Sequence, residues 1–203
     1  MHGGSNRADF SRIDTVFLDR DGVINEKMPE GKYVGSLGDF KILPGAVEAI
    51  ARLHGAGIRV IVVSNQRGVA LGYYSDADVM AIHDELRTKV QRVGGQIDGF
   101  YFCPHDKNEC DCRKPKVGMF EQAKREFPAI SAERSVMIGD SLSDMEFGAA
   151  AGMATIFVRG SQHTQKPGAD RAATAAQRSC DSLAEAVEVV LADRGAVSTE
   201  SSV

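Results

Sequence analysis

Acidic residues follow two apolar runs of the sequence. Asp19 and Asp21 come directly after residues 15–18 (TVFL), and Asp140 comes shortly after residues 136–138 (VMI). A carboxylate can attack phosphorus or exchange protons, and several carboxylates together supply the hard oxygen ligands that Mg²⁺ prefers. A solvated turn is the simpler interpretation of Asp19 and Asp21 taken alone, and helix capping is the simpler one for Asp140.

Two further polar signals would suit a phosphate group. Ser64 and Asn65 follow the apolar run 59–63 (RVIVV), where a hydroxyl and nearby backbone N–H groups could hold phosphoryl oxygens. Lys114 could place a compact positive charge on the same oxygens. A turn role for Ser64 and a surface position for Lys114 are the alternatives. All four signals follow predicted strands in one order along the chain, and together they favour phosphoryl transfer.

Three cysteines and one histidine crowd into ten residues, whereas Cys180 stands alone. The cluster consists of Cys103, His105, Cys110 and Cys112. In a reducing compartment such spacing favours metal ligation over disulfides, and this ligand set suits a closed tetrahedral Zn²⁺ site. Buried free thiols are the alternative. A closed site leaves no position for water, so the zinc would hold the loop rigid and aim Arg113 and Lys114 at the phosphate.

Strands and helices are predicted to alternate along the chain. The predicted strands are residues 15–18, 59–63, 99–102, 136–138 and 154–158. The predicted helices begin after Pro44 and Ser75 and cover residues 119–127, 142–151 and 182–191. This alternation indicates an α/β protein with a parallel sheet covered on both faces. Such sheets bind ligands at the carboxyl ends of their strands, where the polar residues described above fall.

The length of 203 residues suits one domain with frayed ends. We assign residues 1–12 to an N-terminal tail, residues 13–192 to the domain and residues 193–203 to a C-terminal tail.

Charge and hydropathy exclude several kinds of partner. The formal net charge is -4 and the basic residues are scattered, which gives no footprint for nucleic acid or an anionic membrane. No apolar run approaches the ~20 residues that span a bilayer, and residues 1–12 lack the hydrophobic stretch of a secretory signal. We therefore expect a cytoplasmic monomer whose partner is a small phosphorylated metabolite.

The four motifs together resemble those of the haloacid dehalogenase-like (HAD-like) superfamily over about residues 13–192. The resemblance implies a Rossmann-like doubly wound sheet without a large cap domain. It also implies that Asp19 is the nucleophile that forms an aspartyl-phosphate and that Asp21 is the general acid and base. By the same resemblance Ser64 and Lys114 hold the phosphate. Asp19, Asp140 and the backbone carbonyl of Asp21 would be the Mg²⁺ ligands.

The cysteine segment is similar to one branch of that superfamily. The run Cys-Pro-His…Cys-Asp-Cys-Arg-Lys-Pro looks like the zinc-bearing branch of D-glycero-D-manno-heptose-1,7-bisphosphate phosphatases and histidinol-phosphate phosphatases. The segments Gly31-Lys32-Tyr33-Val34 and Leu43-Pro44-Gly45 are similar to the heptose enzymes, whereas the short loop between His105 and Cys110 is similar to the histidinol-phosphate type.

The resemblance therefore implies a Mg²⁺-dependent phosphomonoester hydrolase. The preferred interpretation is the heptose 7-phosphatase of lipopolysaccharide or nucleotide-heptose synthesis. Histidinol-phosphate hydrolysis is the alternative within the same chemistry. A catalytically silent, zinc-stapled binding module is the alternative from another class, and the intact acidic residues disfavour it. Arg67, Arg113 and Lys116 are the candidates for contact with a second phosphate, and Asn65 is expected beside Ser64 in the substrate site.

Overall fold

Six parallel strands form the central sheet of the computed structural model, which describes residues 9–160 and 168–200. In chain order they are β1 (Thr15–Leu18), β2 (Arg59–Asn65), β3 (Gly99–Cys103), β4 (Ser135–Gly139), β5 (Ala154–Val158) and β6 (Arg178–Cys180). Their order across the sheet is β3-β2-β1-β4-β5-β6. The central strands are buried along most of their length, as expected for a parallel sheet covered on both faces. The predicted α/β sheet is confirmed.

The strand order reverses between β1 and β4, and this reversal places the site. Leu18 of β1 lies opposite Val62 of β2 on one side and Ile138 of β4 on the other. The residues that follow these positions therefore leave the sheet at one edge, close together. In open α/β sheets ligands bind at such a switch point, beyond the carboxyl ends of the strands.

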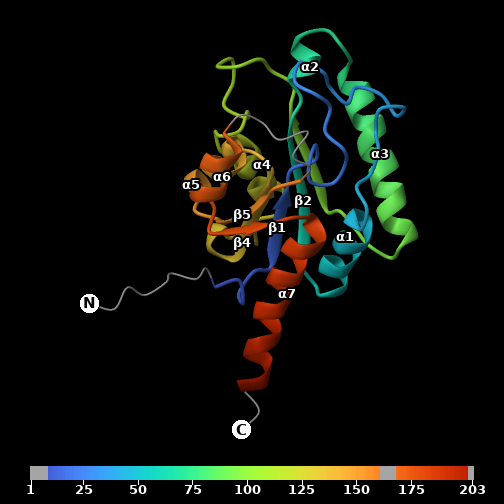
Figure 1. The fold of residues 1–203 in the computed structure, drawn as a ribbon. Coiled ribbons are helices and arrows are strands. Elements are labelled where there is room, and N and C mark those ends of the chain that lie inside the picture. Colours follow the sequence, from blue (N-terminus) through green and yellow to red (C-terminus); the bar gives the residue numbers. More distant parts are fainter. Residues whose placement is uncertain (1–8, 161–167, 201–203) are drawn as a thin grey trace.

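Helices cover both faces of the sheet (Figure 1). One face carries α1 (Ala46–Gly55), α3 (Asp76–Arg92) and α7 (Leu183–Glu200), and the other carries α4 (Gly118–Glu126) and α5 (Leu142–Ala151). Three smaller elements are α2 (Arg67–Ala70), α6 (Ala169–Ala175), which packs on α5, and the 3₁₀ turn η1 (Ala132–Arg134). Alternate residues of β1 serve the two faces: Val16 packs toward α1, and Phe17 packs toward α4.

Local signals in the sequence set several helix ends. Ser75 caps α3 in a capping box with Asp78, as its position predicted. Gly152 ends α5 with a φ of 80°, a left-handed conformation that glycine adopts without steric cost. The N-cap of α5 is Ser141, so the capping role considered for Asp140 is wrong.

Both predicted tails contain structured residues. Phe10 is 2% exposed in the core, and its backbone N–H donates to Asp193 Oδ2 at 3.3 Å. The last helix does not end at Leu191 but continues to Glu200, and residues 192–199 contain no proline that would stop it. The polar composition that suggested a tail from residue 193 is compatible with the end of a helix.

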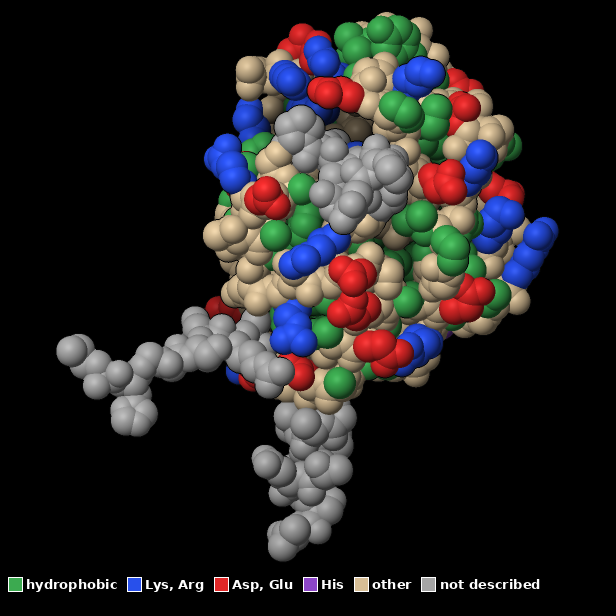
Figure 2. All heavy atoms as spheres, in the orientation of Figure 1, with side chains coloured by type: hydrophobic (Ala, Val, Ile, Leu, Met, Phe, Trp, Pro, Cys, Tyr) green, Lys and Arg blue, Asp and Glu red, His purple; other side chains and the backbone are tan. Residues whose placement is uncertain are grey.

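Helix α6 and strand β6 were not predicted. Strand β6 has three residues, of which only Cys180 is buried, and such a segment shows no period-2 pattern. Among the described residues, none of the helices combines the length and the apolar character that crossing a membrane requires. On the face shown in Figure 2, basic and acidic side chains are interspersed.

Candidate active site

A small pocket opens at the carboxyl edge of the sheet, at the switch point between β1 and β4. Its volume is about 60 Å³. Five of the residues expected in the site line it, namely Asp19, Asp21, Ser64, Asn65 and Lys114. Ser141, Ser143 and Asp144 complete the lining. The pocket is small and its lining is polar, as a site for a phosphoryl group requires.

Three carboxylates meet at this pocket although they are far apart in the sequence. One oxygen each of Asp19, Asp140 and Asp144 lies within 4.8 Å of the others. Gly22 permits this approach, because a Cβ at residue 22 would lie 2.1 Å from Asp140 Oδ2. Lys27 and Lys114 pair with these acids, and the three hard carboxylate oxygens also fit Mg²⁺. Asp144 was not assigned a role from the sequence, although its spacing from Asp140 was a usable signal.

Lys114 lies among these acids and is 3% exposed. Its Nζ contacts Asp19 Oδ1 at 2.9 Å and Asp144 Oδ1 at 2.6 Å, and it donates to the carbonyl of Val63 at 2.8 Å. Burial alone would lower the pKa of Lys114, but the Asp144 and Asp19 carboxylates outweigh it and raise the pKa. The ammonium is therefore charged and faces the pocket, so the surface position considered for Lys114 is wrong.

Three side chains donate hydrogen bonds to Asp21. Arg20 donates to both carboxylate oxygens, Asn25 Nδ2 donates to Oδ1 at 2.9 Å and Gln66 Nε2 donates to Oδ2 at 3.0 Å. Burial would raise the pKa of Asp21, but Arg20 and the hydrogen bonds hold it below its usual range. The carboxylate is therefore ionised in the ligand-free protein, and its side chain remains 25% exposed and faces the pocket.

Asn65 and Ser64 use their side chains differently. Asn65 Nδ2 donates to the carbonyl of Lys114 at 3.1 Å, and Asn65 Oδ1 accepts from the backbone N–H of Lys114 at 3.0 Å. Asn65 thus fixes the backbone that carries the lysine. The Ser64 hydroxyl is 2.6 Å from Gln66 Nε2 and lines the pocket. Binding of substrate by these two residues stays a prediction.

Lys27 contacts the carboxylate cluster and was not predicted from the sequence. Its Nζ forms an ion pair with Asp140 Oδ2, and both side chains are less than a tenth exposed. Residue 27 lies in an irregular segment, and its partner is 113 positions away. A local pattern could not have found this pair.

The cysteine cluster comes together as predicted for a metal site. The Cys110 sulfur lies 3.4 Å from those of Cys103 and Cys112, and His105 Nδ1 lies 3.3 Å from the Cys112 sulfur. A tetrahedral site with Zn–S bonds of about 2.3 Å would separate its sulfurs by about 3.8 Å. The donor set and spacing therefore fit a single Zn²⁺. Cys180 is buried elsewhere, in the core cluster beside α7.

The three candidates for a second phosphate contact differ in their partners. Arg67 pairs with Asp106, with Nη2 and Oδ2 3.1 Å apart, and Lys116 pairs with Asp111 and donates to the carbonyl of Cys110. Both therefore brace the cysteine loop. Arg113 Nη1 is buried and has no hydrogen-bond partner among the described residues, and Arg113 does not line the pocket, so its contact with a second phosphate stays a prediction.

The doubly wound sheet, with a carboxylate cluster and a buried lysine at its switch point, defines the class of HAD-like hydrolases. The family model described as HAD-hydrolase-like matches residues 111–186. D-glycero-alpha-D-manno-heptose-1,7-bisphosphate 7-phosphatase of Mycobacterium bovis is 43% identical over 132 residues, 64% of this chain and 69% of that protein. D-glycero-beta-D-manno-heptose-1,7-bisphosphate 7-phosphatase of Pseudomonas putida is 42% identical over 145 residues, 71% of this chain and 81% of that protein.

Solved structures agree with these relatives. The crystal structure of D,D-heptose 1,7-bisphosphate phosphatase from B. bronchiseptica, complexed with magnesium and phosphate, has a TM-score of 0.79 and 31% identity. It covers 89% of this chain and 99% of its own. The chain belongs to the heptose-1,7-bisphosphate phosphatase family of the HAD-like hydrolases, and it is a phosphatase that hydrolyses phosphomonoesters.

Proposed function

We propose that this phosphatase removes the 7-phosphate of D-glycero-D-manno-heptose 1,7-bisphosphate through an aspartyl-phosphate on Asp19. The single observation that carries the chemistry is the position of Lys114, whose ammonium touches Asp19 at the pocket where Ser64 also lies. The relatives' names support the substrate. Arg113 supports it further, because its unpartnered guanidinium nitrogen suits a second phosphate.

Each residue then has a defined step. An Asp19 oxygen attacks phosphorus while Lys114 and the Ser64 hydroxyl hold the phosphoryl oxygens. Asp21 takes up a proton when the ester binds, because the phosphate brings negative charge beside it, and gives that proton to the departing sugar oxygen. Asp21 then takes a proton from the water that hydrolyses the aspartyl-phosphate. Asp19, Asp140 and the Asp21 carbonyl would hold Mg²⁺, which neutralises charge on the phosphoryl oxygens. Asp144 positions Lys114, and the cysteine cluster would hold a zinc ion that makes the Lys114 loop rigid.

A kinetic comparison tests the substrate. We expect kcat/KM for heptose 1,7-bisphosphate, measured for both anomers, to exceed that for histidinol phosphate by about tenfold to hundredfold, the value of one charged hydrogen-bonded contact. Equal or faster turnover of histidinol phosphate would transfer the assignment to histidine synthesis.

A substitution at Asp19 tests the chemistry. We expect Asp19→Asn to stay folded but to release no phosphate. No phosphorylated enzyme should be detected in this variant. Asp14→Asn is the matched control, because Asp14 lies at the opposite end of β1 and pairs with Arg134. Mg²⁺-dependent turnover by Asp19→Asn near the control's rate would remove Asp19 from the nucleophile role.

A further inference from the structure

Tyr74 is joined to Asp21 through one intervening side chain. The Tyr74 hydroxyl donates to Gln66 Oε1 at 2.7 Å. The amide nitrogen of Gln66 donates in turn to Asp21 Oδ2 at 3.0 Å and to the Ser64 hydroxyl at 2.6 Å. Gln66 is 1% exposed, so water does not compete for these bonds. One amide therefore links the proposed acid and the proposed phosphate holder.

The Tyr74 hydroxyl determines which end of the Gln66 amide faces Asp21. An amide oxygen only accepts hydrogen bonds and an amide NH₂ only donates them. A donor at Oε1 keeps the NH₂ end of Gln66 facing the Asp21 carboxylate. Burial, together with the nearby Asp21 charge, raises the pKa of Tyr74 to about 12, so the hydroxyl keeps its proton and remains a donor. Loss of this hydroxyl would leave the buried Oε1 without its donor, so the amide would be held less firmly against the carboxylate.

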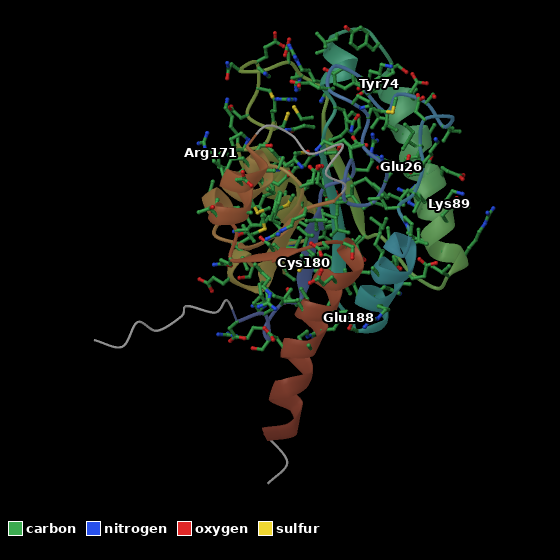
Figure 3. The ribbon with its side chains drawn as sticks, in the orientation of Figure 1. Glu26, Tyr74, Lys89, Arg171, Cys180 and Glu188 are labelled. Atoms are coloured by element: carbon green, nitrogen blue, oxygen red, sulfur yellow. The ribbon has the colours of Figure 1, made fainter. Side chains whose placement is uncertain are left out.

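The surroundings of Tyr74 fix its position. It directly precedes Ser75, whose capping box sets where the chain enters α3. A Cβ at Gly68 would lie 2.1 Å from the Tyr74 ring, and one at Gly35 would lie 2.6 Å from it. Figure 3 shows Tyr74 beside α2 and the start of α3. The ring thus packs against Gly35 and Gly68, where any larger residue would clash with it.

We propose that Tyr74 and Gln66 are positioning residues of the phosphatase reaction, which hold Asp21 where it protonates the leaving sugar oxygen. The proposal rests on the proposed function of Asp21. As the Asp19 oxygen bonds to phosphorus, the bond between phosphorus and the sugar oxygen breaks, and the Asp21 proton goes to that oxygen. A poorly held Asp21 slows this step where the leaving group needs the proton. It does not slow the step for p-nitrophenolate, which departs as a stable anion.

The experiment compares kcat/KM for the sugar bisphosphate and for p-nitrophenyl phosphate, since this ratio reports steps up to the first irreversible one. We expect Tyr74→Phe to lose about tenfold on the sugar ester and little on the aryl ester, as for one hydrogen bond. Gln66→Met, which keeps the side-chain length, should show the same selective loss. Adding Tyr74→Phe to Gln66→Met should cause no further loss, because the hydroxyl acts through the amide.

Tyr73→Phe is the matched control. Tyr73 is the adjacent tyrosine, is 66% exposed and packs on Tyr33. We expect it to retain both activities. Asp21→Asn serves as the reference for the selective loss.

The outcomes separate two failures. If Asp21→Asn slows both esters equally, the acid role of Asp21 fails and the inference fails with it. If Asp21→Asn is selective but Tyr74→Phe slows both esters equally, or adds its full loss to that of Gln66→Met, only the inference is overturned. A folded Tyr74→Phe variant with unchanged kinetics overturns it as well.

Discussion

Lys114 has the most constrained environment of the pocket residues. It is the cation between Asp19 and Asp144, and both acids are largely withdrawn from water. Buried charges are tolerated when they are paired, and removing one partner leaves the other uncompensated. The residue that would neutralise a bound phosphate therefore also stabilises the empty pocket.

We expect Lys114→Met to lower the free energy of unfolding by about 3–5 kcal/mol without Mg²⁺ and kcat by at least about hundredfold. Lys116 lies two residues away and its side chain is half exposed, so Lys116→Met should change the free energy of unfolding by less than about 0.5 kcal/mol. Denaturant unfolding and steady-state kinetics measure both. Activity of Lys114→Met within tenfold of the unsubstituted protein would contradict the assigned role.

His83 predicts a pH dependence of stability. It is 4% exposed and stacks on Phe100, and burial, with a smaller contribution from Arg20, lowers its pKa from 6.5 to about 3. Below pH 6.5 the unfolded chain binds a proton that the folded chain refuses. Stability is thus fully present above pH 6.5 and falls, by up to about 1.4 kcal/mol per pH unit, as the pH drops toward 3.

Urea unfolding between pH 5 and 7 measures this slope. We expect His83→Gln to reduce the slope of unfolding free energy against pH. His54 is a half-buried histidine of α1, and His54→Gln should leave the slope unchanged. Identical slopes in all three proteins would show that His83 does not carry the effect.

Helix α5 and the pocket share a residue. Asp144 Oδ2 accepts from the Ser141 backbone N–H at 3.0 Å in the capping box, while Asp144 Oδ1 contacts Lys114. A Cβ at Gly139 would lie 2.3 Å from Asp144 Cβ, so the turn from β4 into α5 is closed to larger residues. The start of the helix and the position of the lysine are therefore set together.

The loop that carries the cysteine cluster is expected to depend on a bound zinc ion. We expect one equivalent of zinc per chain, lost when Cys110 and Cys112 are both replaced by Ser. Activity should fall with it because Lys114 lies two residues beyond the cluster. Cys180→Ser should keep the zinc, since Cys180 lies in a different core cluster. Metal analysis and kinetics test both variants; a zinc-free native protein with full activity would end the assignment.

The sequence predicted the elements with strong local patterns, including the strand ends that deliver Asp19 and Asp140. It also predicted the cysteine cluster, whose members are close in sequence. It missed Lys27 and Tyr74, because their roles depend on partners brought near by tertiary packing and on loops without periodicity. It missed β6 for a related reason: a three-residue strand is defined by its neighbour β5 and not by its own composition.

The whole molecule is built so that its two halves meet at the pocket. Asp19 comes from β1, which leads through β2 to β3, and Asp140 comes from β4, which leads through β5 to β6. A divalent ion bound by both would link these halves. Ligands that bind only the folded state stabilise it in proportion to their concentration.

We expect Mg²⁺ at about a hundred times its dissociation constant to raise the free energy of unfolding by about 2.7 kcal/mol, or the Tm by roughly 5–10 °C. Asp140→Asn should abolish the increase, and Asp14→Asn, at the opposite end of β1, should retain it. Thermal unfolding with and without Mg²⁺ is the measurement. An equal increase in Asp140→Asn would exclude Asp140 as a ligand.

The pocket of about 60 Å³ is lined by residues at the strand ends and by Lys114. Lys114 follows the cysteine cluster, and Gln66 and Tyr74 follow β2, so the loops beyond the strands carry groups that act in the pocket. Efforts to retarget the enzyme to other metabolites would therefore vary exposed side chains of these loops one at a time and keep those three residues and the cysteine cluster unchanged.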